Sequence, residues 1–227
     1  MKSVRKTKRT TLKRRPERAG YDRAAIDAIV DDALICHVGF LHRGQPAVIA
    51  TACWRENDHI YIHGSSKSRM LVDLVAGSPL CLAVTHFDGL VLARSAFNHS
   101  VNYRALVLYG NAQEVTEPAH KLAALKAFMD KTAPGRWDSV RPPNKQELKA
   151  TKVLRIAIDE ASTKIRTGPP KDDEADYSWP VWAGIVPFRF AAETPIADPK
   201  LPKALPAPKH TRHWAKRRPA RHKRPNA

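Results

Sequence analysis

Residues 35–63 read ICHVGFLHRGQPAVIATACWRENDHIYIH, and this stretch decides the fold. Short polar turns divide it into three runs that are rich in β-branched and aromatic residues. Runs of this kind, separated by turns of a few residues, are typical of neighbouring antiparallel strands. The stretch therefore predicts a three-stranded meander over residues 35–41, 47–54 and 59–63.

Helices and further strands are expected on both sides of the meander. Apolar residues at helical spacing predict helices over 21–34 and 117–131, the second with Leu122, Leu125 and Phe128 on its apolar face. Shorter patterns predict helices over 66–76 and 145–150, and strands over 80–86, 91–94, 105–115 and 151–158. Many short strands with few helices predict a barrel of the mainly β (α+β) class.

The basic residues are concentrated at the two ends of the chain. The formal net charge is +17, but residues 1–18 carry nine Lys or Arg against one acid, and residues 199–227 carry ten against none. Residues 19–198 hold 20 basic and 21 acidic residues. A neutral body argues against a fold that itself binds nucleic acid.

Composition also divides the chain into three parts. Residues 1–18 are expected to be a basic disordered tail, residues 19–190 a single globular domain, and residues 191–227 a disordered tail rich in Pro, Lys and Arg. No apolar run approaches the roughly 20 residues needed to span a bilayer, so no membrane association is expected. The three cysteines have no metal-ligand spacing and indicate buried free thiols in a cytoplasmic protein, with no metal site.

The segment YIHGSSKSR (61–69) has the residues of a phosphate site. A strand ends at His63, and serines, Lys67 and Arg69 follow just before a predicted helix. Backbone amides at a helix start, hydroxyl groups and two cations bind phosphate well. Taken alone, the segment is equally consistent with a polar loop whose charges are solvated.

A second polar segment lies between two apolar runs in LVLARSAFNHSVNYRALVLYG (90–110). A flavin ring needs hydrogen-bond partners for its carbonyls and nitrogens and apolar contacts for its faces. This insert offers both, but it also reads as a hairpin connection whose polar residues face water.

Together these segments resemble the flavoproteins of the pyridoxamine 5′-phosphate oxidase-like family, in the branch of flavin-nucleotide-binding proteins and nitroimidazole-resistance reductases. The resemblance extends from residue 13 to about residue 187. Besides the stretches quoted above, it rests on DGLVLARSAFNHSVNYR (88–104), PGRW (134–137), ELKAT (147–151), GPPKDDEADY (168–177) and PVWAGIVP (180–187).

The resemblance implies an FMN-binding, six-stranded antiparallel split β-barrel with peripheral helices, which binds two FMN molecules in grooves of a homodimer. It assigns Lys67, Ser68 and Arg69 to the flavin phosphate and His63 to the strand that passes the flavin. The other implied cofactor-binding residues are Ile49, Ala50 and Thr51 beside the ring system, Asn102, Tyr103 and Arg104 near its pyrimidine end, and Trp182 near the flavin of the partner subunit.

Two positions depart from the family pattern. Ala50 stands where relatives often carry proline, and Ala105 follows Asn-Tyr-Arg where a serine is common. The loss of one serine hydroxyl would remove a hydrogen bond worth roughly 1 kcal/mol. That loss weakens flavin binding without preventing it.

The catalytic residue is unknown from the sequence. His63 is the candidate proton donor, and His99 is a second one, because histidine titrates near neutral pH. Each is also consistent with an ordinary hydrogen-bonding role in the core or at the surface. The leading hypothesis is an FMN-dependent oxidoreductase that acts on an unknown small molecule at the dimer groove.

Two alternatives stay open. One is a flavin carrier or sensor without turnover. The other is a polyanion-binding protein that contacts nucleic acid weakly through its basic tails and uses the barrel as a dimer scaffold, with Trp214 stacking on an unpaired base. A solvated tail without a ligand explains the same composition.

Overall fold

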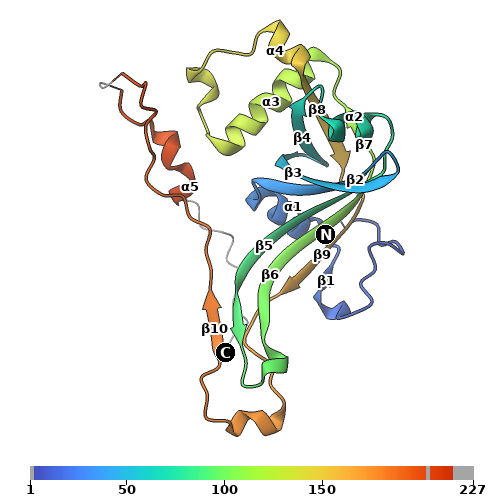
Figure 1. Cartoon of the computed structure of the whole chain (residues 1–227), viewed down its shortest axis with the longest axis vertical. Coiled ribbons are helices and arrows are strands. Elements are labelled where there is room, and N and C mark those ends of the chain that lie inside the picture. Colours follow the sequence, from blue (N-terminus) through green and yellow to red (C-terminus); the bar gives the residue numbers. More distant parts are fainter. Residues whose placement is uncertain (1–2, 203–204, 217–227) are drawn as a thin grey trace.

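The meander predicted for residues 35–63 is confirmed. In the computed structural model, which describes residues 3–202 and 205–216, strands β2 (Ile35–His42), β3 (Gln45–Glu56) and β4 (His59–Ser65) pair in antiparallel order (Figure 1). Two-residue turns join them. In the first turn Arg43 and Gly44 have φ values of 52° and 76°, a conformation whose twist matches that of the flanking strands.

The remaining strands extend this meander into one curled antiparallel sheet. Its order is β1-β9-β6-β5-β2-β3-β4-β8-β7, and β10 pairs with β5. The bounds are β1 (Ala19–Gly20), β5 (Leu80–Leu92), β6 (Ser100–Gly110), β7 (Ala112–Glu114), β8 (Thr151–Ala157), β9 (Glu160–Arg166) and β10 (Gly184–Pro187). The fold is mainly β, and its curled sheet is consistent with the expected split barrel.

The expected count of six strands differs from the ten strands of the described residues. Asn111 separates β6 from β7, and residues 158–159 separate β8 from β9, so two long strands each count twice. Residues 80–92, expected as two strands, form one strand with a register shift between Phe87 and Gly89. Strand β9 and the short edge strands β1 and β10 were not expected.

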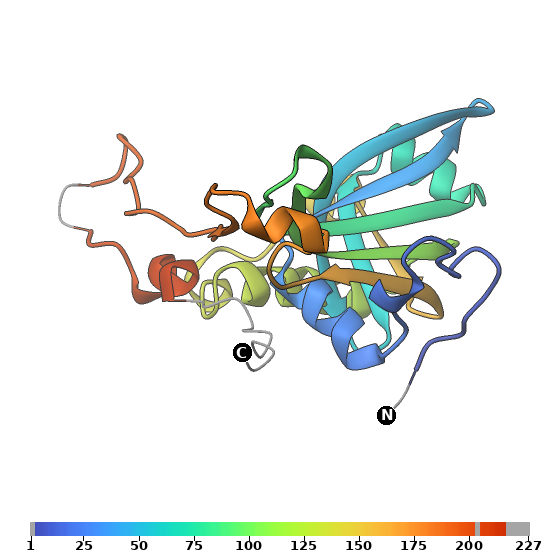
Figure 2. The same cartoon turned by 90° about the horizontal axis from the view of Figure 1, so that it is seen from below.

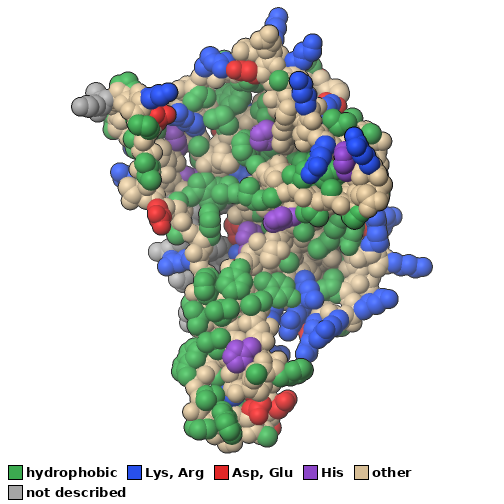
Figure 3. Space-filling model, viewed as in Figure 1, with side chains coloured by type: hydrophobic (Ala, Val, Ile, Leu, Met, Phe, Trp, Pro, Cys, Tyr) green, Lys and Arg blue, Asp and Glu red, His purple; other side chains and the backbone are tan. Residues whose placement is uncertain are grey.

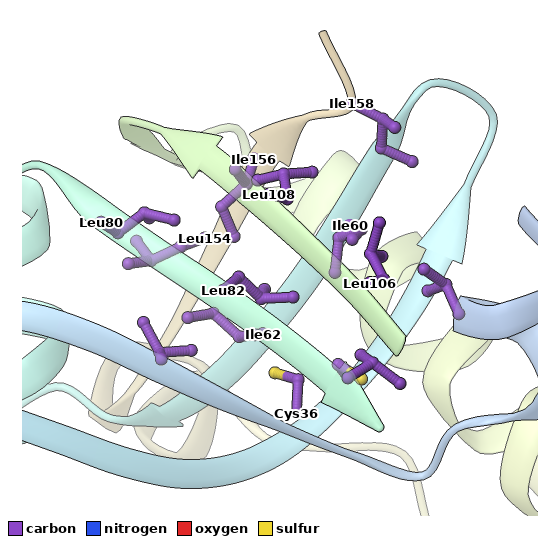
Figure 4. Packing of buried hydrophobic residues seen from close by; sticks show 14 of the residues in the cluster. Cys36, Ile60, Ile62, Leu80, Leu82, Leu106, Leu108, Leu154, Ile156 and Ile158 are labelled. Atoms are coloured by element: carbon purple, nitrogen blue, oxygen red, sulfur yellow. The ribbon is translucent and has the colours of Figure 1, made fainter. Parts of the chain in front are cut away.

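The core lies inside the curl of the sheet. Alternate residues of each strand point inward, so that Ile60 and Ile62 of β4 are fully buried while their neighbours face outward. Figure 4 shows these side chains packed against residues of the other strands. The labelled members of this cluster include Cys36, Leu80, Leu82, Leu106, Leu108, Leu154, Ile156 and Ile158.

Two helices close the open sides of the core. Helix α1 (Arg23–Asp32) begins at Asp22, whose carboxylate accepts a hydrogen bond of 3.0 Å from the backbone amide of Ala25. Its buried residues include Ile26 and Ile29. Helix α2 (Arg69–Val75) buries Met70, Leu71 and Leu74, and it starts three residues later than expected.

Helices α3 (Pro118–Thr132) and α4 (Lys145–Ala150) lie over the outer side of the sheet (Figure 1). The expected apolar face of α3 is confirmed in part, since Leu125 and Phe128 pack against buried residues of the sheet. Leu122 is 36% exposed, whereas Ala124 is fully buried and packs in a second apolar cluster that includes Trp54 of β3. The side of α3 that is buried depends on the strand residues against which the helix packs. These strand residues, Trp54, Tyr61 and Val153, lie far from α3 in the sequence.

The N-terminal segment is not a free tail. Residues 3–18, expected to be disordered, pack along the sheet, where the backbone amide of Val4 donates to the carbonyl oxygen of Tyr21 at 3.0 Å. Thr10 is 1% exposed, and Nε of Arg9 donates to Glu160 at 3.1 Å. Basic composition predicted disorder, but the acidic partner on β9 and the buried threonine anchor the segment.

The C-terminal segment also departs from expectation. After β10, residues 188–202 and 205–214, which we call the C-terminal arm, extend beyond the barrel and return toward α3 (Figures 1 and 2). The arm ends in the short helical turns η5 (Lys209–Arg212) and α5 (His213–Lys216), where Nε1 of Trp214 donates to the carbonyl oxygen of Thr132 at 2.8 Å. Residues 203–204 and 217–227 of the expected tail lie outside the described residues.

No helix of the described part of the chain is long and apolar enough to cross a membrane.

Candidate functional site

The outward face of β4 carries a cluster of aromatic rings. His63 lies with its ring centroid 5.6 Å from that of Trp54 and 4.8 Å from that of Phe128 in α3. Tyr61, two residues before His63, stacks on Trp54 at 5.6 Å. Strand alternation thus places His63 outside the barrel and beneath the C-terminal half of α3.

Two polar atoms in this cluster have no hydrogen-bond partner in the described residues. They are Nδ1 of His63 and Nε1 of Trp54, both buried. A buried polar atom left unpaired costs about 1–3 kcal/mol, and native proteins retain few of them. Unpaired nitrogens of this kind are what a bound cofactor or substrate would satisfy.

Burial also sets the charge of His63. Desolvation lowers the pKa of the His63 imidazole below its ordinary value of 6.5. The ring is therefore neutral at neutral pH, and a neutral imidazole can accept a hydrogen bond or bind a metal ion.

A turn with two unpaired cations follows directly after His63. The backbone amide of Ser66 donates to the carbonyl oxygen of Ala150 at 2.7 Å, which fixes the turn. Lys67 and Arg69 are exposed, and neither side chain forms an ion pair within the described residues. Ser68 precedes α2 without using its hydroxyl group as a cap. The turn therefore offers two cations and a hydroxyl group to an anion.

The three predicted residues of β3 lie on different faces. Ile49 packs against the core, Thr51 is half-buried, and Ala50 is exposed on the outer face. Ala52 is the strand neighbour of Ile35 and precedes Cys53, the partner of Ile62, so it lies level with His63. Small side chains at 50 and 52 leave the outer face beside His63 accessible to a flat ring.

The side chains of Asn102 and Arg104 have partners within the chain. Asn102 donates to the carbonyl oxygen of Gly168 at 3.2 Å and accepts a hydrogen bond from the guanidinium group of Arg166. Arg104 is 5% exposed and is held by two carboxylates, that of Asp88 at 3.0 Å and that of Asp32 at 2.9 Å. Both side chains bind partners of their own chain, so neither is available to a flavin here.

Tyr103 and Trp182 are distant from the β4 turn in the single chain. Tyr103 is half-buried on the opposite face of β6 from its two neighbours. Trp182 is 67% exposed in the segment that precedes β10, at the end of the molecule opposite β4 (Figure 1).

His99, the second candidate proton donor, is exposed, and its Nδ1 pairs with the carbonyl oxygen of Ser95 at 2.8 Å.

One chain thus brings together residues 49–51, 63 and 67–69 but not 102–104 or 182. Sequence reasoning gave Trp54 no role and missed its place beside His63. An aromatic residue in an apolar strand gave no signal of an unpaired indole N–H.

The sequence matches the family model described as "Pyridoxamine 5'-phosphate oxidase" over residues 22–165. No curated protein matches the chain. The fold is similar to that of the flavocytochrome Anf3 from Azotobacter vinelandii, with 41% identity and a TM-score of 0.88, over 92% of this chain and 97% of that one.

Two further solved structures are similar. The FAD and heme binding protein from Mycobacterium smegmatis has 32% identity and a TM-score of 0.83, over 87% of this chain and 97% of that one. A structure from Bacteroides thetaiotaomicron, assigned to 5-nitroimidazole antibiotic resistance, has 19% identity and a TM-score of 0.56, over 65% and 86% of the two chains. At that identity the likeness concerns the fold alone.

The buried His63 predicts a pH dependence of stability. Because its folded-state pKa is lowered, the unfolded chain binds the proton more tightly. Stability is lost as the pH falls below 6.5 toward the folded-state value, at about 1.4 kcal/mol for each unit of lowering. His63→Phe should reduce this loss, as measured by urea unfolding at about pH 7.5 and about pH 5.5.

His99→Phe, at an exposed position, is the matched control and should follow the wild type. An equal loss of stability in the wild type and His63→Phe would contradict the prediction.

Proposed function

The chain belongs to the pyridoxamine 5′-phosphate oxidase family, and on that premise we propose that it is a flavin-dependent oxidoreductase that acts on a small molecule. One observation carries the proposal. The strand-to-helix turn after β4 holds the unpaired cations Lys67 and Arg69 within a few residues of a buried, unpartnered histidine nitrogen. A bound flavin would supply hydride or electron transfer, while the protein supplies binding and orientation.

Charge pairing elsewhere supports this assignment of the two cations. Arg23, Arg55 and Arg104 each pair with a carboxylate of the chain. Lys67 and Arg69 have no such partner in the described residues, so a phosphate group can bind both without breaking an existing pair. Ser68 adds a hydroxyl donor.

FMN is the flavin expected from the sequence, and FAD contains the same riboflavin 5′-phosphate unit. The M. smegmatis structure with 32% identity is described as an FAD and heme binding protein. FAD is therefore better supported by the relatives, and Lys67, Ser68 and Arg69 would hold the riboflavin phosphate of either molecule. The mass of the flavin released on denaturation distinguishes the two.

Lys67→Ala and Arg69→Ala should each weaken flavin binding about tenfold or more, since a hydrogen bond to a charged group contributes roughly 1.5–3 kcal/mol. The measurement is flavin absorption per protein after purification and after titration with added FAD or FMN. Arg43→Ala, which removes an exposed cation from the β2–β3 turn, is the control and should retain the flavin.

A wild-type protein that carries no flavin and binds neither FAD nor FMN would refute the proposed function. Unchanged occupancy in both variants would refute only the phosphate site. Bleaching of the bound flavin by a reductant, followed by reoxidation with turnover of a substrate, separates an oxidoreductase from the carrier or sensor of the first alternative.

A second cofactor is supported by the same two relatives. They are described as a flavocytochrome and as an FAD and heme binding protein. Four other histidines of the described residues already have partners, His42 with Asp73, His86 with Ile29, His99 with Ser95 and His120 with Tyr61. His63 is neutral, and its Nδ1 is buried without a partner. We therefore propose His63 as a heme ligand, with Trp54 and Phe128 as apolar contacts.

His63→Ala should abolish the Soret absorption of bound heme, whereas Lys67→Ala and Arg69→Ala should lower flavin content and retain heme. The spectrum of the purified protein, followed by a pyridine hemochrome assay, measures both cofactors in one sample. His99→Ala, at an exposed position outside this face of the sheet, is the matched control. Retention of heme in His63→Ala would show that the iron ligand lies elsewhere and would return His63 to the role of candidate proton donor.

A homodimer is proposed from the outer face of β2 and β3. Leu41 is 45% exposed and Val48 is 67% exposed on this face, next to Ala50. Exposed apolar residues that lie together on a sheet are typical of an interface.

Val48→Asp should shift the protein from dimer to monomer in sedimentation equilibrium, because it places a charge in the apolar contact. Val72→Asp, on α2 and 46% exposed, is the control and should remain dimeric. A wild-type protein that sediments as a monomer would contradict the proposed interface.

Polyanion binding through the tails stays a prediction. In the described part of the arm, Trp214 donates to a backbone carbonyl and contacts the barrel, which does not favour its stacking on a base. Residues 217–227, which carry much of the basic charge, lie outside the described residues.

A further inference from the structure

A pocket of about 480 Å³ lies between the C-terminal arm and the barrel. Its volume is within the range of small-molecule sites. None of the flavin-phosphate residues lines it. The lining residues come from the end of α1, from the outer part of β5 and from the arm, and are Asp32, Ala33, Leu34, Ile35, Thr85, His86, Phe87, Asp88, Arg104, Phe188, Arg189, Phe190 and Trp214.

The arm builds one wall of this pocket through three contacts. The backbone amide of Phe188 donates to the carbonyl oxygen of Asp88 at 3.0 Å. The rings of Phe87 and Phe188 meet edge to face, with centroids 5.0 Å apart. At the far end, Trp214 is held by its hydrogen bond to Thr132. The pocket therefore exists because the arm is fastened at both ends.

Aromatic side chains make up much of the wall. Phe87, Phe188, Phe190 and Trp214 all line the pocket, and Phe190 is 79% exposed. Figure 3 shows apolar side chains gathered where the arm meets the barrel. Aromatic rings prefer stacked or edge-to-face partners, so this wall favours a flat aromatic molecule.

The charges of the lining favour an anion. Arg104 neutralises Asp32 and Asp88 in a buried ion-pair network. Arg189 of the arm is exposed and has no ion pair within the described residues. A free guanidinium group at the edge of an apolar pocket binds carboxylate, sulfonate or phosphate with two parallel hydrogen bonds.

The pocket is also close to the proposed cofactor site. Ile35 of the pocket is the strand partner of Ala52, and Ala52 lies level with His63 on the next strand. Two strand spacings separate Ile35 from His63, about 10 Å across one continuous face. A molecule in the pocket would lie beside a flavin or heme held near β4.

We propose that this pocket binds a planar aromatic anion, with the ring system against Phe188 and Trp214 and the anionic group on Arg189. That this molecule is the substrate of the oxidoreductase rests on the proposed function. The binding itself rests only on the pocket and its lining.

The test uses the full-length protein as purified, with 2-naphthoate as the probe and isothermal titration calorimetry as the measurement. We expect saturable binding, weakened about tenfold in Arg189→Gln, since one charge-assisted contact is lost. The neutral analogue 2-naphthamide should bind the wild type as weakly as 2-naphthoate binds Arg189→Gln. Arg43→Gln, which removes a cation far from the pocket, is the control.

A second variant tests the aromatic wall. Phe190→Ala should weaken 2-naphthoate and 2-naphthamide alike, because it removes a ring of the pocket wall and keeps both anchors of the arm, at Phe188 and Trp214. Thermal unfolding of each variant shows that the barrel is folded. Phe97→Ala, which removes a ring that is 92% exposed and outside the pocket, should leave both ligands unaffected.

Flavin and heme content, measured on the same samples, separates the two proposals. If the protein binds naphthoate but contains neither cofactor, the result supports the proposed ligand pocket and refutes the proposed oxidoreductase function. Absence of naphthoate binding in a protein that carries flavin overturns the pocket proposal alone. Binding that appears only after heme has been extracted also overturns it, because the pocket would then be the heme site.

Discussion

The alternation of side chains along a closed, curled sheet is the constraint on which the rest of the structure depends. Ile60 and Ile62 fill the interior of the barrel, so Tyr61 and His63 must face outward. The interior is occupied by aliphatic side chains and leaves no room for a cofactor. Any site of this fold therefore lies on the outer face, where helices and the arm must shield it from water.

Electrostatic pairing on that outer face separates structural charges from available ones. Arg104 is fixed by Asp32 and Asp88, and a buried guanidinium group paired in this way is costly to remove. The side chains of Lys67, Arg69 and Arg189 extend from a turn and from the arm, where no carboxylate reaches them. Hydration stabilises such exposed charges in the free protein. An anionic ligand can bind them without competing with an internal partner.

Local patterns predicted the local structure well. The meander, the helix that starts after Asp22 and the turn before α2 all depend on residues within a few positions of one another. The errors concern contacts between distant residues. The resemblance placed Arg104 near the flavin, and its ion pair with Asp32, 72 residues away, gave no local signal in the sequence. Arg9 and Glu160 are 151 residues apart, which is why composition alone predicted a disordered N-terminal tail.

The proposed cofactor site and the proposed ligand pocket draw on different parts of the chain. The family model ends at residue 165, and the residues proposed to hold flavin and heme, 63 and 67–69, lie within it. The arm begins beyond that boundary and supplies Phe188, Arg189 and Trp214 to the pocket. The similarity to the Anf3 flavocytochrome covers 92% of the chain, which is too much to end at residue 165. At least part of the arm is therefore shared with that structure, and in this chain the arm provides Arg189 and three of the four aromatic residues of the proposed pocket.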